Sequence, residues 1–229
     1  MMETERLFIR PFEHGDIDLI YRIYSDEEIL RYTPFDVKNR KQAEAHLTAI
    51  IKDWDAEPRL SYEMAVILKK TAEKIGRTHI LIDPETDTGM IGTLLIQEHW
   101  GHHYATEVSE ALLDFCFTHL KLHRVNAVCN PDNTASWHML EKIGLRREAL
   151  LRQKCRYVKN GNQSWHDELE YAILESEYLP RSGNGMQISG CRKRGEPCNS
   201  ESGYTIIHTV QREAIDDSPV GRRDKIGQD

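Results

Sequence analysis

Three strand-like segments follow one another near the middle of this chain, and they constrain its fold more than any other feature. They read YEMAVIL, KIGRTHILID and GMIGTLLI, and charged residues or Asp, Pro and Gly separate each from the next. Short runs rich in apolar residues and bounded by turn residues are typical of strands, and close spacing along the chain favours an antiparallel meander. We therefore expect these segments to form one sheet.

Helical patterns lie on both sides of the expected meander. Asp16 is expected to cap a first helix, and a second runs from about 39 to 54. Between them Pro34 cannot continue a helix, so the surrounding RYTPFDV is predicted to be a loop. From Tyr104 to about Leu120 apolar residues recur every three or four positions, which predicts a helix packed on the sheet.

The remaining segments complete a mixed α/β (α+β) pattern. RLFIRPF near the start is expected to be extended, HRVNAVC a strand, and NTASWHMLEKIG a helix closed by Gly144. Two late strands, about 147 to 158 and 165 to 174, flank an Asn160-Gly161 turn. After Pro180 the chain becomes rich in Gly, Ser and charge. We expect a domain over 1–179 and a mostly disordered tail over 180–229.

Composition excludes several classes of protein. The formal charge of -7 disfavours a surface for nucleic acid, and only a CRKRG cluster in the tail supports the hypothesis of a nucleic-acid-binding adaptor. No run approaches the roughly 20 apolar residues of a membrane span, and the N-terminus lacks the plan of a secretory signal. A cytoplasmic protein that binds neither membrane nor nucleic acid is expected, and it could be a monomer or a homodimer.

The cysteines indicate neither disulfides nor a metal site. The chain has five, an odd number, and none stands in a CxxC pair. Cys116 lies on the apolar stripe of a predicted helix and Cys129 ends a predicted strand, so both are expected to be buried and inert. A ping-pong reaction through a cysteine nucleophile is therefore disfavoured.

The segment EHWGHHYATEV places Gly101 between a predicted strand and a predicted helix. Unpaired N–H groups and the helix dipole point at one place there, which suits a bound anion. A plain turn from strand to helix would use a glycine in the same way. The glycine alone therefore leaves both interpretations open.

The surrounding sequence resembles a known family. GTLLIQEHWGHHYATEV, followed by LHRVNAVCNPDNTASWHMLEKIGLRREALLRQ, is similar to the GNAT superfamily of acetyl-CoA-dependent N-acetyltransferases, in particular to its RimJ/RimL branch of ribosomal-protein-alanine acetyltransferases. The resemblance covers about residues 4 to 178. It implies a mostly antiparallel, twisted sheet with a V-shaped splay between two adjacent strands and about four flanking helices.

The resemblance also implies where acetyl-CoA, the co-substrate, would bind. The pantetheine arm would lie along the strand at Leu94, Leu95 and Ile96 and contact Asn133, which can also cap the following helix. The pyrophosphate would meet the backbone N–H groups of Gly101, His102, His103, Tyr104 and Ala105. No step of this reaction needs a metal, and we predict none.

Two positions depart from the family pattern Gln/Arg-x-x-Gly-x-Gly/Ala. Glu98 stands at the first position and His103 at the last. A histidine adds bulk where backbone should approach phosphate, so either its ring turns outward or affinity falls. Alternatively, His102 or His103 contributes partial positive charge beside the pyrophosphate, or both are simply solvated.

The chemistry needs a proton donor for sulfur and a proton acceptor for the amine. Many relatives use a tyrosine as the donor, but Leu140 occupies that position, and Ser136 is the donor that the resemblance implies. Glu98, His99 and Glu148 are the alternatives for the acceptor of the amine proton. We predict that Glu98 and Ser136 are the catalytic residues.

The acceptor pocket is expected between two segments. One is the loop with Tyr32 and Phe35, and the other is the late hairpin with Tyr157 and Trp165, although packing at the edge of the core is the simpler expectation for Trp165. The predicted activity is transfer of an acetyl group to a primary amine, on a peptide N-terminus or a small molecule. The alternative is a catalytically impaired acyl-CoA-binding module of the same fold.

Overall fold

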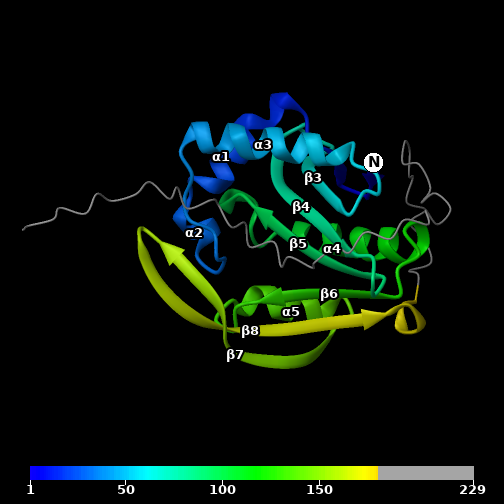
Figure 1. The fold of residues 1–229 in the computed structure, drawn as a ribbon. Helices are drawn as coiled ribbons and strands as arrows, with labels where there is room; N and C mark the ends of the chain where they lie inside the picture. Colours follow the sequence, from blue (N-terminus) through cyan, green and yellow to red (C-terminus); the bar gives the residue numbers. More distant parts are fainter. Residues whose placement is uncertain (180–229) are drawn as a thin grey trace, which may run out of the picture. The chain divides into compact units, whose positions relative to one another are not determined.

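The computed structural model describes residues 1–179, which build an eight-stranded sheet with helices on both faces (Figure 1). The expected tail over 180–229 lies outside the described residues. The strands are β1 (Met2–Glu3), β2 (Leu7–Pro11), β3 (Ser61–Leu68), β4 (Lys74–Asp83), β5 (Thr88–Leu95), β6 (Arg124–Cys129), β7 (Arg146–Lys159) and β8 (Asn162–Leu174). Their order across the sheet is β1-β2-β3-β4-β5-β6-β8-β7.

Every neighbouring pair of strands is antiparallel except β5 and β6, which run parallel. The predicted meander is confirmed as β3-β4-β5. The late hairpin is confirmed as well, and its turn residues Asn160 and Gly161 both have positive φ, 50° and 76°. Two successive positive φ values give the turn a twist that matches that of the strands.

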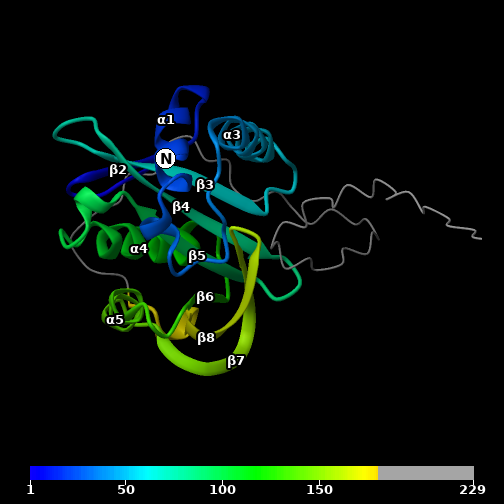
Figure 2. The ribbon, with the colours of Figure 1, turned by 90° about the vertical axis from the view of Figure 1, so that its left-hand side faces the viewer.

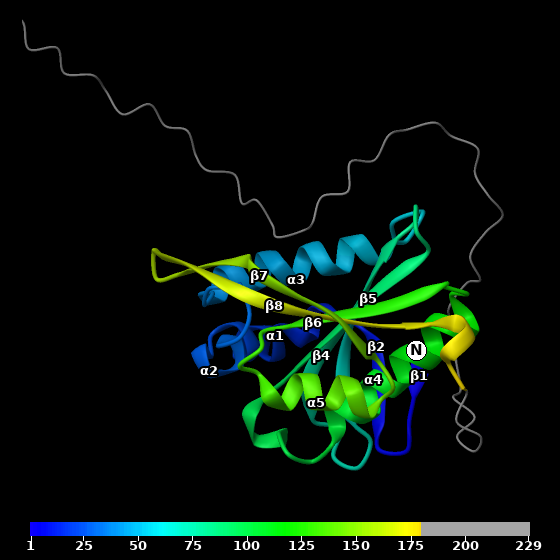
Figure 3. The same cartoon turned by 90° about the horizontal axis from the view of Figure 1, so that it is seen from below.

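Helices cover the two faces of the sheet. They are α1 (Ile17–Tyr24), α2 (Glu27–Leu30), α3 (Arg40–Trp54), α4 (Tyr104–Asp114), which continues as a π-helical turn over Phe115–His119, and α5 (Thr134–Lys142). Helix α3 lies on one face, whereas α4 and α5 lie on the other (Figures 2 and 3). The apolar stripe of α4, including Val108 and Leu112, is buried in the same core as Ile80 and Ile91 of the sheet.

Two local expectations were wrong or incomplete. Asp16 stands at the start of α1, but its carboxylate makes no capping bond there; it is buried and pairs with Arg10 and Lys74. Burial opposes ionisation of Asp16, but hydrogen bonds from Arg10, from Lys74 and from the Glu13 N–H outweigh it and lower its pKa to about 2. The short helix α2, capped by Asp26, was not predicted.

The sheet splits between β5 and β6. Their pairing is limited to Thr88–Arg124, Gly89–Val125 and Met90–Asn126, after which the two strands diverge. Figure 1 shows β5 leaving β6 toward the side of α2 and the tip of the β7–β8 hairpin. The V-shaped splay implied by the sequence resemblance is therefore present, and it orients the candidate site.

Candidate active site

The first wall of the site is the N-terminus of α4, directly after β5. Gly101 has φ +77° and His103 has φ +63°, so the chain makes a left-handed turn into the helix. The N-cap position, His103, makes no side-chain capping bond. Within the described residues the backbone N–H groups from Gly101 to Ala105 have no hydrogen-bond partner. This is expected at the start of an uncapped helix, whose first N–H groups have no partner inside the helix. This arrangement suits an anion.

The His103 ring is exposed and so does not fill this N-terminus. The imidazole therefore turns outward to solvent and does not block the approach of an anion to the backbone. A non-glycine residue in the left-handed region costs of order 1 kcal/mol, and histidine tolerates that region better than most. The neighbouring His102 ring lies against Tyr104, with ring centroids 5.7 Å apart.

The backbone of β5 supplies further donors to the splay. The Ile96 N–H donates to the Ile75 carbonyl oxygen across β4, 2.9 Å away. Because N–H direction alternates along an antiparallel strand, the amides of Thr93 and Leu95 point the other way, toward the side that β6 has left. The carbonyl oxygen of Leu95 accepts from the Trp100 indole at 2.8 Å.

The opposite wall is the end of β6 and the start of α5. Asn133 caps α5 as predicted, because its side-chain oxygen accepts the Ser136 N–H at 3.2 Å. Ser136 neighbours Cys129: burial raises the pKa of the Cys129 thiol to about 11, and the Ser136 hydroxyl partly opposes this rise. Ser136 thus stands at the open end of β6.

The predicted proton acceptor Glu98 lies in a short 3-10 turn after β5, Gln97–His99. Its carboxylate forms an ion pair with Arg22 of α1 and is largely exposed. A hydrogen bond from its own backbone N–H, together with the Arg22 guanidinium, lowers the pKa of Glu98. Glu98 therefore stays ionised at neutral pH and contacts solvent.

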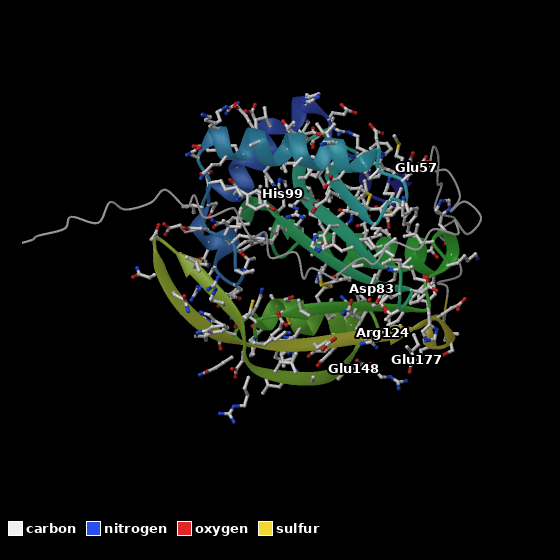
Figure 4. The ribbon with its side chains drawn as sticks, in the orientation of Figure 1. Glu57, Asp83, His99, Arg124, Glu148 and Glu177 are labelled. Atoms are coloured by element: carbon white, nitrogen blue, oxygen red, sulfur yellow. The ribbon has the colours of Figure 1, made fainter. Side chains whose placement is uncertain are left out.

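The other two alternatives for the proton acceptor lie in different places (Figure 4). His99 follows β5, and its Nε2 is 3.1 Å from a carboxylate oxygen of Glu73. Glu148 is paired with Arg124, whose backbone neighbours Thr88 at the paired end of β5 and β6. Glu148 therefore lies at the closed end of the splay, which does not suit a proton acceptor for the amine.

Arg6 is a site neighbour that the sequence reasoning missed. Its Nη1 donates to the His102 carbonyl oxygen at 3.1 Å, and its guanidinium lies 4.5 Å from the centroid of the Tyr104 ring. Glu107 pairs with the same guanidinium. A cation therefore stands beside the uncapped helix. The sequence carried no signal for it, because Arg6 and His102 are far apart along the chain.

The expected acceptor side contains a cavity of about 330 Å³ between α2, the following loop and the hairpin tip. Phe35, Asp36, Lys159 and Asn160 are among its lining residues. The hairpin is held there by Lys159, whose Nζ donates to the Leu30 carbonyl oxygen at 2.7 Å.

Tyr157 and Trp165 on this hairpin differ from each other. Tyr157 is buried, and its hydroxyl donates to the Tyr32 carbonyl oxygen at 2.8 Å. Trp165, in contrast, is 54% exposed, so the expectation of packing at the edge of the core was wrong. Cys129–Leu169 is the last pairing of β8 with β6, so Trp165 lies where only β7 accompanies β8.

Two further features of residues 1–179 concern metal binding and membrane crossing. No cluster of three or more His, Cys, Asp or Glu side chains in this range could hold a metal ion. None of the helices in the range combines the length and the apolar character that crossing a membrane requires. Cys116 and Cys129 are both buried, as expected, and burial raises the pKa of each thiol.

Comparisons with known proteins agree with this geometry. Residues 6–146 match the family model of the acetyltransferase (GNAT) domain. The uncharacterized N-acetyltransferase YnaD of Bacillus subtilis (strain 168) is 34% identical over 175 residues, covering 76% of this chain and 97% of YnaD. The crystal structure of a GNAT-family acetyltransferase from Bacillus anthracis is 32% identical with a TM-score of 0.66, covering 77% of this chain and all of that one.

A third structure shares the fold at lower identity. It is spermidine N-acetyltransferase from Vibrio cholerae in complex with CoA and spermine, 21% identical with a TM-score of 0.66, and the match covers 76% of this chain and 98% of that one. At this identity the likeness concerns the fold alone.

Proposed function

Because the chain belongs to the GNAT acetyltransferase family and is an acetyl-CoA-dependent N-acetyltransferase, we propose that it transfers the acetyl group directly to a primary amine in a ternary complex. The observation that carries the proposal is the uncapped α4 N-terminus at the end of a strand that has separated from its neighbour. The EHWGHHYATEV and NTASWHMLEKIG motifs favour the RimJ/RimL branch.

The two walls of the splay suit the parts of acetyl-CoA. The amides from Gly101 to Ala105 would bind the pyrophosphate, with Arg6 nearby as a cation. The pantetheine arm would run along Leu94, Leu95 and Ile96, where the backbone of β5 no longer pairs with β6. Asn133, on the other wall, would contact the same arm.

The chain's own groups can then serve each step of the transfer. The Thr93 and Leu95 amides would polarise the thioester carbonyl while the neutral amine attacks its carbon. As the C–N bond forms and the C–S bond breaks, Glu98 would take the nitrogen's proton through water. Ser136 would donate a hydrogen bond to the leaving thiolate, which takes its proton from water.

A covalent cysteine intermediate is disfavoured by the same geometry. Burial keeps the thiols of Cys116 and Cys129 protonated, and a protonated thiol is a poor nucleophile. Direct transfer needs neither thiol.

The test has two measurements on the purified full chain. Calorimetry should detect acetyl-CoA binding, and a thiol reagent should detect CoA release when peptides with free N-termini, amino-acid amides or polyamines are added. Binding without turnover of any amine would instead favour the catalytically impaired module. Failure to bind acetyl-CoA would contradict both.

A further inference from the structure

A polar cluster inside the fold plays no part in the steps above. Arg77 of β4 is buried, and its guanidinium contacts the Tyr24 hydroxyl of α1 and the Glu63 carboxylate of β3. His46 of α3 lies 3.2 Å from the same hydroxyl. The fifth member, His79, extends from β4 on the same face of the sheet, with its Nδ1 3.2 Å from Nη2 of Arg77.

The contact with Arg77 fixes the tautomer of His79. A guanidinium can only donate hydrogen bonds, so Nδ1 of His79 must accept. Burial, reinforced by the charge of Arg77, lowers the pKa of His79 to about 3, so the imidazole is neutral at ordinary pH. A neutral ring whose Nδ1 accepts carries its proton on Nε2. His79 is therefore an obligate hydrogen-bond donor at Nε2.

This donor has no protein partner. Within residues 1–179 the Nε2 of His79 makes no hydrogen bond. It is also not one of the fully buried polar atoms that have no hydrogen-bond partner. The His79 side chain is half-buried and its Nε2 is not fully enclosed by protein, so a bound group can reach it. A group that satisfies this donor must carry a lone pair.

The ring lies beside the splay. A Cβ added to Gly92 of β5 would stand 2.4 Å from Cε1 and 2.9 Å from Nε2 of His79, so the ring covers the place where a side chain at position 92 would be. Gly92 comes two residues after Met90, the last residue of β5 that pairs with β6. The imidazole edge thus faces the backbone where the strands begin to diverge.

Contacts between side chains also connect His79 to the acceptor cavity. Arg77 contacts Tyr24, and the Tyr24 ring packs edge-on against Phe35 with centroids 5.9 Å apart. Phe35 lines the cavity beside the hairpin tip. His79 and the cavity therefore belong to one continuous packed layer on the α1 and α3 face of the sheet.

We propose that Nε2–H of His79 binds a carbonyl oxygen of the acceptor, so that the acceptor is an α-amino carbonyl compound, such as a peptide N-terminus or an amino-acid amide. This inference rests on the proposed acetyl transfer and narrows its substrate class. In such a compound the oxygen and the reacting nitrogen are separated by two carbon atoms, so one small site can hold both. The thioester carbonyl has the β5 amides and does not need His79.

Polyamines do not fit this donor. Their nitrogen atoms are mostly protonated at neutral pH and then only donate hydrogen bonds, and they carry no oxygen. A donor without a partner would face another donor, which leaves a buried polar group unsatisfied. The inferred site would therefore disfavour polyamines such as spermine, which is bound in the Vibrio cholerae structure.

The experiment compares L-alaninamide with (S)-3-methyl-2-butanamine, an acceptor of the same shape in which methyl groups replace the carbonyl oxygen and the amide nitrogen. For each, kcat and KM are measured with the wild-type protein and with His79→Phe, which keeps a ring over Gly92 but has no N–H. Because the ratio of the two acceptors is compared between proteins, the different basicity of the amines cancels. His79→Gln, whose amide can accept from Arg77 and donate outward, is the rescue variant, and exposed His123→Phe is the matched control.

We expect the preference for alaninamide to fall about 10-fold in His79→Phe, the effect of one lost hydrogen bond, mostly through KM. His79→Gln should recover part of it, and His123→Phe should keep all of it, with acetyl-CoA affinity unchanged throughout. An unchanged preference in His79→Phe, or a wild type that acetylates spermidine as well as alaninamide, overturns the inference while leaving acetyl transfer intact. If no amine is turned over, the proposed function fails and the inference falls with it.

A second readout is independent of turnover. Nitrogen-detected NMR of the histidine rings should show Nδ1 of His79 unprotonated and Nε2 protonated, still neutral at about pH 5 because of the depressed pKa. A ring protonated on Nδ1 would remove the donor on which the inference depends.

Discussion

Asn133 is expected to serve both the fold and the binding of acetyl-CoA. Its side chain caps α5, so Asn133→Ala should lower the free energy of unfolding by about 1 kcal/mol. If the amide also contacts the pantetheine arm, acetyl-CoA affinity should fall about 10-fold as well. Urea unfolding and calorimetry measure the two effects separately.

Asn39 supplies the matched control, because its side chain also caps a helix: it accepts the N–H of Gln42, three residues on, at 3.0 Å. Asn39→Ala should cost similar stability and leave acetyl-CoA affinity unchanged. Equal losses of affinity in the two variants would reduce Asn133 to a structural cap.

Glu98 is expected to act on the proton of the amine without holding the donor. Glu98→Gln should lower kcat by roughly 10²-fold, the smaller end of the range for general-base catalysis, because the proton is expected to travel through water. The KM for acetyl-CoA should not change. Since Arg22 and the backbone keep the carboxylate ionised, the pH profile of the wild type should follow the basicity of the amine alone.

The control for Glu98 is Glu85→Gln, an exposed carboxylate at the turn between β4 and β5. If Glu98→Gln retains wild-type kcat, the proton leaves by another route and Glu98 serves only as the partner of Arg22.

At the scale of elements, the hairpin β7–β8 closes the acceptor side through a few bonds. The buried Tyr157 hydroxyl donates to the Tyr32 carbonyl oxygen, and burial raises the pKa of Tyr157 to about 12, so it remains a donor. Tyr157→Phe removes this bond and should cost about 1 kcal/mol of stability. The KM for the amine should rise while the affinity for acetyl-CoA stays constant.

Tyr21→Phe is the control, because the Tyr21 hydroxyl makes no hydrogen bond within residues 1–179. Equal effects of the two substitutions on KM would mean that the bond to Tyr32 does not shape the acceptor side.

The elements that the sequence predicted are those with a clear period or a clear stop. The meander, α4, β6, α5 and the hairpin are long enough to show alternation or helical spacing, and Gly144 ends α5 with φ +101° as expected. Helix α2 has only four residues and β1 only two, which is too short for any period to appear. The π-helical turn at the end of α4 has no simple sequence signature.

The candidate site was predictable only where one segment builds it. The placement of Gly101 and Asn133 at the starts of helices could be predicted because strand, turn and helix follow one another in sequence. The positions of Arg22 and His79 could not be predicted, because they come from elements whose packing no local pattern reveals. Alternation along β4 would assign Arg77 and His79 to a solvated face, but α1 and α3 cover that face.

At the scale of the whole molecule, the buried polar cluster predicts how stability depends on pH. Burial and the charge of Arg77 lower the pKa of His46 to about 4 and that of His79 to about 3, from 6.5 in the unfolded chain. Below about pH 6.5 both histidines therefore become protonated in the unfolded state but stay neutral in the folded state. The free energy of unfolding consequently falls as pH falls. The loss should be about 2 kcal/mol for each histidine between about pH 7.5 and pH 5.

Urea unfolding across this range measures the slope, and His46→Gln isolates one contribution. The variant should lose less stability on acidification than the wild type, by about 2 kcal/mol, because glutamine does not titrate. Asp16 does not confuse the measurement, since its pKa of about 2 places the loss of its contribution below about pH 4. If the free energy of unfolding of the two proteins depends on pH in the same way, His46 is protonated in the folded state. The histidines around Arg77 would then not both be neutral, and the assignment of a neutral His79 would be contradicted.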